Sequence, residues 1–460
     1  MGKNALVNKQ LSRRSFLQAA AATAGVMVTA ACAAPAPAAG DAMDSGDDGG
    51  METVELRLAY WGFQVEKQGV LQEAFQEAYP NIKLQEDITS WSNYWQKMLA
   101  STAAGDSPDI MHHSPYYHVR FAHNGVTIPL DPFIERDGVD LNDFYEGAIT
   151  QGRWQPGQIR CGSGDLHAFP TVWHSGTMWF WNKNWFAEKG IPDPDESWTW
   201  DTIVEAGKEF TVINDDGSAE SYGMDTPVDG NARMNFWIFQ AGGAFYDEDY
   251  NGCLIKEDAP MEAFQWMVDL INEHEVAMPP EANLQFNPFE TGRVAFAVMG
   301  DWMIPSFSEI EDFEWDVFTP PSHPVTGQNT IDAYQNGISI TSSAPHPDES
   351  WEYIKWLTMG DGAVMYAETI FPFPAHIPTA EGLIYVQDRT APPTQLWILN
   401  QLLKDATPVF NGPAEGEIAG IAREEQEAAM LQVKTVQEAT DDLESRVNAV
   451  LERSREELLG

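Results

Sequence analysis

Hydrophobic positions near residue 55 alternate with polar ones, and the spacing then lengthens to that of a helix. Val54, Leu56, Leu58 and Tyr60 fall on one face of an extended segment, which predicts a strand. The elements predicted after it alternate in type: a helix at 66–79, a strand at 82–85, a helix at 92–104 and a strand at 109–111. This order of strand, helix, strand, helix, strand is typical of a mostly parallel α/β sheet.

The same alternation resumes after an interruption. Helices are predicted at 199–211, 259–274 and 348–358, and strands at 293–299 and 337–340. The strand at 293–299 is apolar almost throughout, so we expect both of its faces to be buried. The C-terminal segment 415–457 is helical in pattern. Its apolar stripe is short and rich in small residues, so we expect it to dock on the body rather than form an exposed coiled coil.

The first 31 residues have the layout of an export signal. Four basic residues, the last two being Arg13 and Arg14, precede an uncharged apolar run at 16–31 that is short for a membrane span. The sequence SRRSFLQ at 12–18 resembles the twin-arginine export signal, which is an address read by a receptor. Residues 1–31 are therefore interpreted as a twin-arginine-type signal peptide.

Cys32 follows this run in the sequence TAAC, which resembles the cleavage box of bacterial lipoproteins. The box usually has Leu or Val where this chain has Thr29, so ordinary cleavage near Ala31 or Ala34 stays open. The expected organisation is a lipid-anchored Cys32 followed by a tether that reaches residue 52. Its Ala, Pro, Gly and acidic residues have no apolar periodicity. The resulting location is the cell surface or periplasm, with the lipid in the membrane.

The chain of 460 residues carries a formal charge of −44, and removal of residues 1–31 makes it −48. So acidic a protein is not expected to bind nucleic acid or anionic lipid. Cys161 and Cys253 remain after Cys32, and outside the cytoplasm they could form a disulfide or stay as two buried thiols. No spacing typical of a zinc site or of a cofactor site occurs, so we expect neither metal nor cofactor.

Several short motifs occur in a characteristic order between residues 53 and 455. They are FQEAYPNIKL at 75–84, AGDSPDI at 104–110, GVTIPLD at 125–131, HAFP at 167–170 with WNK at 181–183, and FETGRVAF at 289–296 with GDW at 300–302. In order and spacing they resemble the extracellular solute-binding family of bacterial sugar importers, which includes maltodextrin- and trehalose-binding proteins.

This resemblance implies a two-lobed α/β fold of the periplasmic-binding-protein type (type II), with ligand held in a cleft between lobes joined by crossing strands. It places lobe one at 53–168 plus 319–342 and lobe two at 172–316 plus 346–460. The implied function is capture of a sugar or short oligosaccharide by hinge closure and delivery to the permease of an ABC importer. We expect a monomer with no enzymatic activity.

Sugar recognition requires aromatic faces for C–H patches and polar groups for hydroxyls. The chain has 17 Trp, and those near predicted strand ends are the strongest candidates. The resemblance places ligand contacts at Gln64, His113, Tyr116, Trp173 or His174, and Trp302. Position alone adds Trp61, Trp91, Tyr94 and Tyr117 near strand ends, Asp301 beside Trp302, and Tyr334 near a proposed hinge; Trp237 and Phe371 are weaker candidates.

Three alternatives remain at this level. The ligand could be a polyamine or a peptide, although a polyamine site would require several carboxylates in the cleft. A secreted polysaccharide hydrolase is a remote alternative, because no pattern marks a catalytic carboxylate pair.

The segment 247–258 resembles part of a calcium loop, but its twelfth position is Asp258 and not Glu, so we interpret it as a hairpin turn.

Overall fold

The computed structural model describes residues 53–459 except 217, 227–230, 281–286, 371–372 and 384–389. The predicted signal peptide, the anchor Cys32 and the tether lie outside the described residues, as does the candidate Phe371. Within the described part, no helix combines the length and the apolar character needed to cross a membrane.

The first of two main sheets contains six strands. They are β1 (Val54–Trp61), β2 (Ile82–Thr89), β3 (Ile110–His113), β6 (Phe169–His174), β12 (Asp332–Ile340) and β13 (Thr407–Pro408). Five of them follow the order β13–β12–β3–β1–β2, and β6 pairs with β12. β1 is parallel to both β2 and β3, which confirms the predicted alternation, whereas β12 runs antiparallel to β3 and β6.

Alternation along β1 decides which helix covers which face. Leu58 packs in the cluster that contains Phe75 of α2 (Val65–Ala78), whereas Ala59 packs with Tyr94 of α3 (Trp91–Ala103). The Tyr94 hydroxyl, at 3.1 Å from the Ala59 carbonyl and 2.9 Å from the His112 carbonyl, joins α3 to two strands. Tyr94 is therefore a structural residue of the core.

The second sheet has five strands in the order β11–β7–β10–β9–β8. These are β7 (Met178–Asn182), β8 (Val212–Ile213), β9 (Ala219–Met224), β10 (Val294–Met299) and β11 (Trp315–Phe318). The apolar run of β10 lies between β7 and β9, and Val294 to Val298 are all buried, as predicted. Trp237 is also buried, against Trp179, Trp200 and Trp266, so it belongs to this core.

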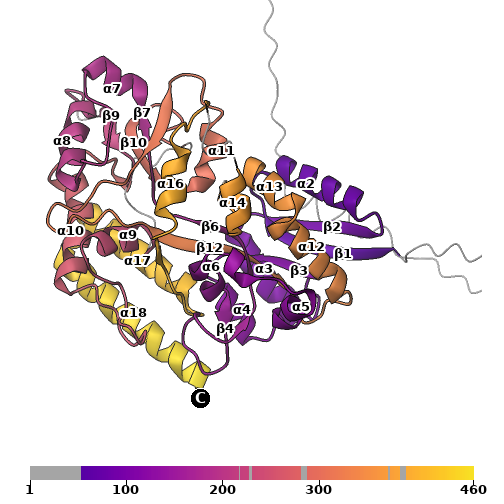
Figure 1. Ribbon diagram of the computed structural model, residues 1–460. Helices are drawn as coiled ribbons and strands as arrows, with labels where there is room; N and C mark the ends of the chain where they lie inside the picture. Colours follow the sequence, from indigo (N-terminus) through magenta and orange to yellow (C-terminus); the bar gives the residue numbers. More distant parts are fainter. Residues whose placement is uncertain are drawn as a thin grey trace, which may run out of the picture. The chain divides into compact units, whose positions relative to one another are not determined.

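The remaining elements surround these two sheets. They are α4 (His118–His123), α5 (Asp131–Asp137), η1 (Leu141–Asp143), α6 (Glu146–Gln151), β4 (Arg153–Trp154), β5 (Asp165–Leu166), α7 (Lys183–Lys189), α8 (Trp200–Phe210), α9 (Asn231–Gln240), α10 (Asp258–Asn272), η3 (Asp301–Met303), α11 (Ile304–Phe307), α12 (Pro347–Met359), α13 (Asp361–Thr369), α14 (Ile377–Gly382), α16 (Leu396–Leu402), α17 (Glu415–Met430) and α18 (Val436–Leu459). Figure 1 shows α2, α12 and α13 beside β1 and β2, and α7 and α8 beside β7 and β9.

Two short crossings that connect the sheets are joined through one carboxylate. Residues 175–177 lead from β6 to β7, and residues 319–331 lead from β11 to β12. The Ser175 and Thr177 hydroxyls both donate to Oδ1 of Asp332, at 3.1 and 2.6 Å. Asp332 is fully buried, and this burial raises its pKa to about 6. The carboxylate therefore holds the start of β12 to the first crossing.

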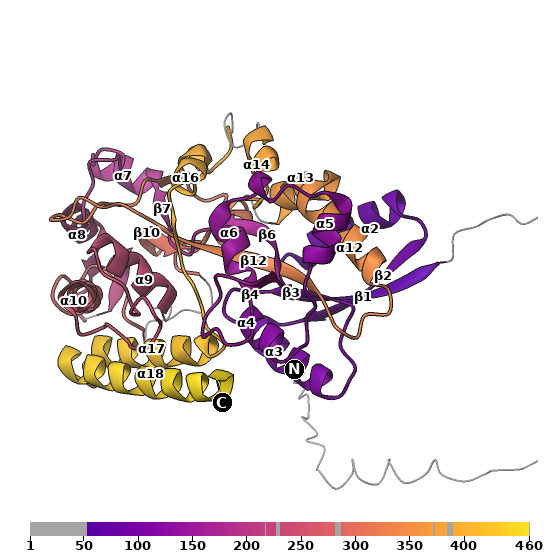
Figure 2. The ribbon, with the colours of Figure 1, turned by 60° about the horizontal axis from the view of Figure 1, so that its bottom comes forward.

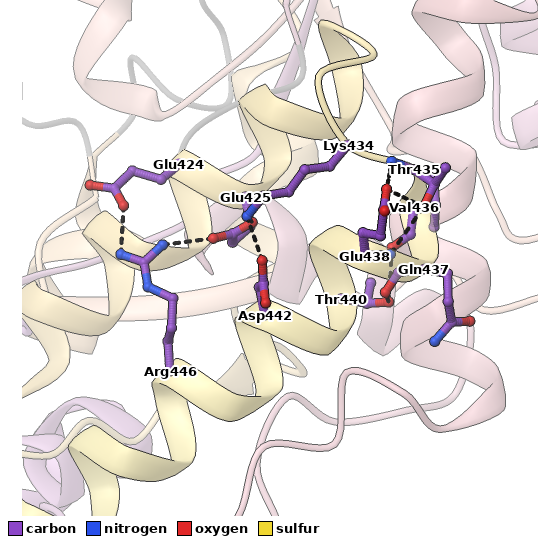
Figure 3. Close-up of polar contacts among 10 residues, drawn as sticks. All are labelled: Glu424, Glu425, Lys434, Thr435, Val436, Gln437, Glu438, Thr440, Asp442 and Arg446. Carbon is purple, nitrogen blue, oxygen red and sulfur yellow. Dashed lines mark hydrogen bonds and ion pairs between the residues drawn. The ribbon is translucent and has the colours of Figure 1, made fainter.

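The C-terminal segment forms a helical hairpin that docks on the second lobe. α17 and α18 lie side by side, and α17 also contacts α9 and α10 (Figure 2). Arg446 of α18 donates to Glu424 and to the buried Glu425, and Lys434 donates to Glu425 and Asp442 (Figure 3). Docking was predicted from the sequence; the break at 431–435, which turns one long pattern into two helices, was not.

One part of the expected lobe division differs from the structure. The helices α12 and α13 contact β1, β6, β12 and α2, so residues 347–369 pack with the first sheet and not with lobe two. Thr341, at the end of the expected lobe-one segment 319–342, donates its backbone N–H to the Asp109 carbonyl at the end of that sheet. The spacing of apolar residues in α12 would be the same whichever sheet the helix packed on. Periodicity alone could therefore not show to which lobe α12 belongs.

The two cysteines of the described region are both buried and free, so the disulfide alternative is wrong. The Sγ of Cys161 accepts a hydrogen bond from the Asn411 N–H, and the Cys253 N–H donates to Asn448. The segment at 247–252 is a hairpin turn: Asp247 pairs with Gly252, and Tyr246 bridges to Cys253.

Candidate functional site

A cavity of about 580 Å³ lies where residues from both lobes converge. This volume is within the range of small-molecule sites, and the cavity lies beyond the carboxyl ends of β1 and β3, where α/β sheets bind ligands. Its lining residues are Trp61, Gly62, Phe63, Trp91, Ser114, Pro115, Tyr116, Tyr117, His174, Gly176, Trp302, Tyr334, Asn336, Gly416, Ala419, Gly420 and Arg423.

The lobe-one wall is aromatic. Trp61 meets Trp91 edge-on, with ring centroids 5.1 Å apart, and it also contacts Trp95. Trp91 begins α3 and remains 45% exposed, which is unusual for so large an apolar side chain. Tyr117 stacks on Trp95 at 4.0 Å, so its ring is fixed by the lobe-one core. Such a wall offers ring faces and edges to the apolar patches of a ligand.

Trp302 supplies an aromatic ring from the second lobe. It lies in η3, directly after β10, and it is partly buried against the core. Gly300 makes this placement possible, because a Cβ at that position would lie 1.9 to 2.2 Å from the Trp302 ring. The Trp302 ring also meets the imidazole of His174 edge-on, with centroids 5.8 Å apart.

His174 is oriented by a buried carboxylate. Its Nδ1 lies 3.0 Å from Oδ1 of Asp301, whose side chain is fully buried. Burial raises the pKa of Asp301, and the neighbouring His174 opposes that rise. With the proton on Nδ1, His174 donates a hydrogen bond to Asp301, and this bond fixes the orientation of the imidazole edge at the cavity.

Seven of the twelve main candidates line the cavity: Trp61, Trp91, Tyr116, Tyr117, His174, Trp302 and Tyr334. The other five do not, and one of them is the core residue Tyr94. Asp301 lies behind His174, and Gln64 is the N-cap residue of α2, next to the lining residue Phe63. His113 is fully buried against Phe121. Trp173 is buried, and its indole N–H donates to the Leu403 carbonyl at 3.0 Å.

The wall formed by α17 was missed by sequence reasoning. Gly416, Ala419, Gly420 and Arg423 recur at helical spacing on one face of α17, and this face lines the cavity. The opposite face, which includes Ile418 and Ala422, is buried in the second lobe. The small residues were visible in the sequence, but they indicated only close packing. Phe63, Ser114 and Asn336 carried no signal beyond their proximity to strands.

The titratable groups in the described ranges form no metal site. Among the residues that the structure describes, no group of three or more His, Cys, Asp or Glu side chains is arranged to hold a metal ion. His112, which follows Met111 in β3, is buried, and desolvation lowers its pKa to about 4. Desolvation also lowers the pKa of His113, with a contribution from neighbouring histidines.

Comparison with known proteins identifies the family. Residues 63–359 match the bacterial extracellular solute-binding proteins. A protein of Sinorhizobium fredii named as an amino-acid ABC transporter periplasmic-binding protein is 24% identical over 294 residues, which cover 60% of this chain and 62% of that protein.

Solved structures give the fold. An ABC substrate-binding protein from Listeria monocytogenes, in complex with cycloalternan, has a TM-score of 0.76 at 18% identity and covers 87% of this chain and 99% of its own. The maltose/maltodextrin-binding domain MalE from Bdellovibrio bacteriovorus, bound to maltotriose, has a TM-score of 0.72 at 17% identity over 87% of this chain and 100% of its own. The chain therefore belongs to the bacterial extracellular solute-binding proteins and has their two-lobed α/β fold.

Proposed function

We propose that this protein is the substrate-binding subunit of an ABC importer and that it captures a sugar or short oligosaccharide. The observation that carries the proposal is the position of indole rings on both sides of one cavity. Trp61 and Trp91 come from the first lobe, and Trp302 comes from the second. A pyranose has apolar C–H faces that pack on such rings, and its rim hydroxyls can bond to groups such as Asn336 and His174.

The crossings between the lobes support capture by closure. A ligand that touches Trp61 and Trp302 at once binds both lobes only when they are close together, so it shifts the population toward the closed form. The closed protein then docks on a membrane permease and releases the ligand to it. Two of the similar solved proteins are complexes with cycloalternan and with maltotriose, which favours a carbohydrate here too.

The proposal includes export and anchoring. The twin arginines at 13 and 14 would direct the folded protein across the membrane, and lipidation of Cys32 would hold it near the permease. Mass spectrometry of the protein from the native cell tests this point. An N-terminus at Cys32 with an added diacylglycerol mass is expected, and an unmodified N-terminus produced by cleavage near Ala34 would exclude the anchor.

The ligand class is tested by thermal unfolding of the purified protein against mono- and oligosaccharides, polyols, amino acids, amines and peptides. A ligand that binds only the folded form raises the midpoint with the logarithm of its concentration. We expect a saturable shift with one carbohydrate and its loss in Trp302→Ala. Trp397→Ala, at an exposed tryptophan outside the cavity, is the matched control.

Two other results would replace the sugar assignment. A shift with amino acids alone would follow the name of the Sinorhizobium relative, and a shift with amines or peptides alone would also keep the importer while changing its cargo. Release of reducing ends from a polysaccharide would indicate a hydrolase.

A further inference from the structure

A second cavity, of about 400 Å³, adjoins the candidate ligand cavity. Tyr117 of the first lobe and Gly416 of the second line both cavities, so these two residues mark the border between them. A Cβ at Gly416 would lie 2.9–3.0 Å from the Tyr117 ring, so the two lobes touch at this border. The volume of the second cavity is itself within the range of small-molecule sites. The space between the lobes therefore extends beyond the cavity already described.

The first-lobe wall of the second cavity is one face of α4 and the residue that ends this helix. Arg120, His123 and Asn124 recur there at helical spacing, and all three are exposed. Phe121, on another face of α4, is fully buried in the first-lobe core. The His123 imidazole also meets the Trp154 ring edge-on, with ring centroids 5.7 Å apart. The helix therefore holds a fixed row of polar side chains against this cavity.

The second-lobe wall comes from the start of α17 and the end of α18, which lie side by side in the C-terminal hairpin (Figure 2). Arg453 of α18 donates a hydrogen bond to Glu417 of α17 at 2.6 Å, and Ser454 and Glu457 follow Arg453 in the wall. Arg453 and Glu417 are each about half exposed. A guanidinium has five N–H donors and a carboxylate has two oxygens, so one mutual bond leaves both groups able to bind a ligand.

The lining of the second cavity suits the hydroxyls of a sugar better than an apolar group. Its charged side chains are of both signs, and no Trp or Phe is among the described residues that line it. Carboxylate, guanidinium and amide groups bond to hydroxyls as acceptors and donors. The first cavity, in contrast, offers the indole rings of Trp61, Trp91 and Trp302. A part that stacks on sugar rings is therefore followed, past Tyr117, by a part that binds hydroxyls.

We propose that the ligand is an oligosaccharide longer than the first cavity, and that its terminal part passes Tyr117 and binds in the second cavity. The proposal rests on the proposed function and narrows its substrate class from a sugar of any length to an oligosaccharide. A terminal unit in the second cavity bonds to α4 on one side and to Glu417 and Arg453 on the other. A longer ligand then bridges the lobes at two places, so it favours the closed form more strongly than a short one does.

The experiment measures affinity against ligand length by calorimetry, with linear series of glucose, mannose and galactose from the monosaccharide to the hexasaccharide. The proteins are the wild type, Asn124→Trp, Glu417→Ala and Asn142→Trp. Asn124→Trp fills the second cavity from an exposed position, and Glu417→Ala removes a carboxylate from its wall. Asn142→Trp is the matched control, because this exposed asparagine lines a separate cavity beside α6. The unliganded melting midpoint of each variant reports whether the fold is intact.

In one series, the wild type should bind the longest member at least tenfold more tightly than the shortest member that binds. Asn124→Trp should abolish this advantage, and Glu417→Ala should weaken the longest member about three- to tenfold, the usual effect of losing one hydrogen-bonding group. Both variants should change the affinity for the shortest member less than threefold, and Asn142→Trp should change no affinity appreciably. Affinity that does not depend on length, or a length dependence that survives Asn124→Trp, would overturn this inference and leave the sugar-binding function standing. Failure of every carbohydrate would overturn the proposed function itself.

Discussion

Acid should destabilise this protein through histidines buried beneath the cavity. His112 and His118 are both fully buried, and desolvation lowers the pKa of each from 6.5 to about 4. His112 has no hydrogen-bond partner at Nε2 among the described residues, and His118 bonds through Nδ1 to the Pro115 carbonyl. In the unfolded chain, both imidazoles become protonated near pH 6.5, whereas in the folded protein they stay neutral until the pH falls to about 4.

The sign and size follow from proton linkage. Between pH 6.5 and 4 the unfolded state binds more protons, so the free energy of unfolding falls as the pH falls through this window. At pH 5, each of His112 and His118 removes about 2 kcal/mol, at 1.36 kcal/mol per pKa unit. Asp332, whose pKa is raised to about 6, becomes protonated in the same window and returns about 1 kcal/mol. The net loss from these three groups, about 3 kcal/mol, is large beside a typical total of 5–15 kcal/mol.

Urea unfolding at pH 7.5 and pH 5.0, with His112→Leu beside the wild type, tests this account. Leucine has no proton to bind, so the variant should lose about 2 kcal/mol less than the wild type between the two pH values. His123→Gln, at an exposed histidine, is the control and should behave like the wild type. If His112→Leu and the wild type lose the same free energy within about 0.5 kcal/mol, the buried histidines do not cause the acid sensitivity.

Three further predictions concern the contacts between and within the lobes. Asp332→Asn removes a carboxylate whose protonation stabilises the folded state at pH 5. In the same urea experiment, the unfolding free energy of this variant should therefore fall between pH 7.5 and 5.0 by about 1 kcal/mol more than that of the wild type. Glu425→Gln should lower the unfolding free energy by about 1–2 kcal/mol, because the buried Glu425 carboxylate loses its charge while its partners Arg446 and Lys434 are only partly exposed. Glu424→Gln at an exposed position should cost less than about 0.5 kcal/mol. In Gly416→Ala the new Cβ would lie 2.9–3.0 Å from the Tyr117 ring, so calorimetry should show about tenfold weaker binding of the ligand found in the panel, and adding Tyr117→Ala should restore part of it.

The sequence predicted the first lobe well because its signals are local. Alternation in β1 and helical spacing in α2 and α3 gave the order of elements and their parallel pairing. Candidate residues placed after strands, such as Trp61 and Tyr116, line the cavity because the carboxyl ends of parallel strands meet at one edge of the sheet. Whether they contact a ligand stays a prediction.

Long-range packing was beyond the reach of these signals. Trp173 and His174 are neighbours on β6, so their side chains point to opposite faces of the sheet and only one of them can reach the cavity. The sequence did not show which of the two it would be. The side of the molecule that receives α12, and the turn that separates α17 from α18, depend on contacts between residues far apart in the chain. The α17 wall was missed for the same reason, since Gly416 and Arg423 become cavity residues only after the C-terminal hairpin docks.

The contact between Tyr117 and Gly416 affects both ligand binding and closure of the two lobes. Tyr117 is fixed in lobe one by its stack on Trp95, and Gly416 begins the helix that is anchored in lobe two. Both residues line the cavity, so the place where the lobes touch is also a place where a ligand would lie. A side chain at residue 416 would clash with the Tyr117 ring. It would therefore keep the lobes from closing fully, and it would also take up part of the cavity volume. For this reason we expect affinity and closure to change together in every variant of this contact, while the stability of each lobe changes little.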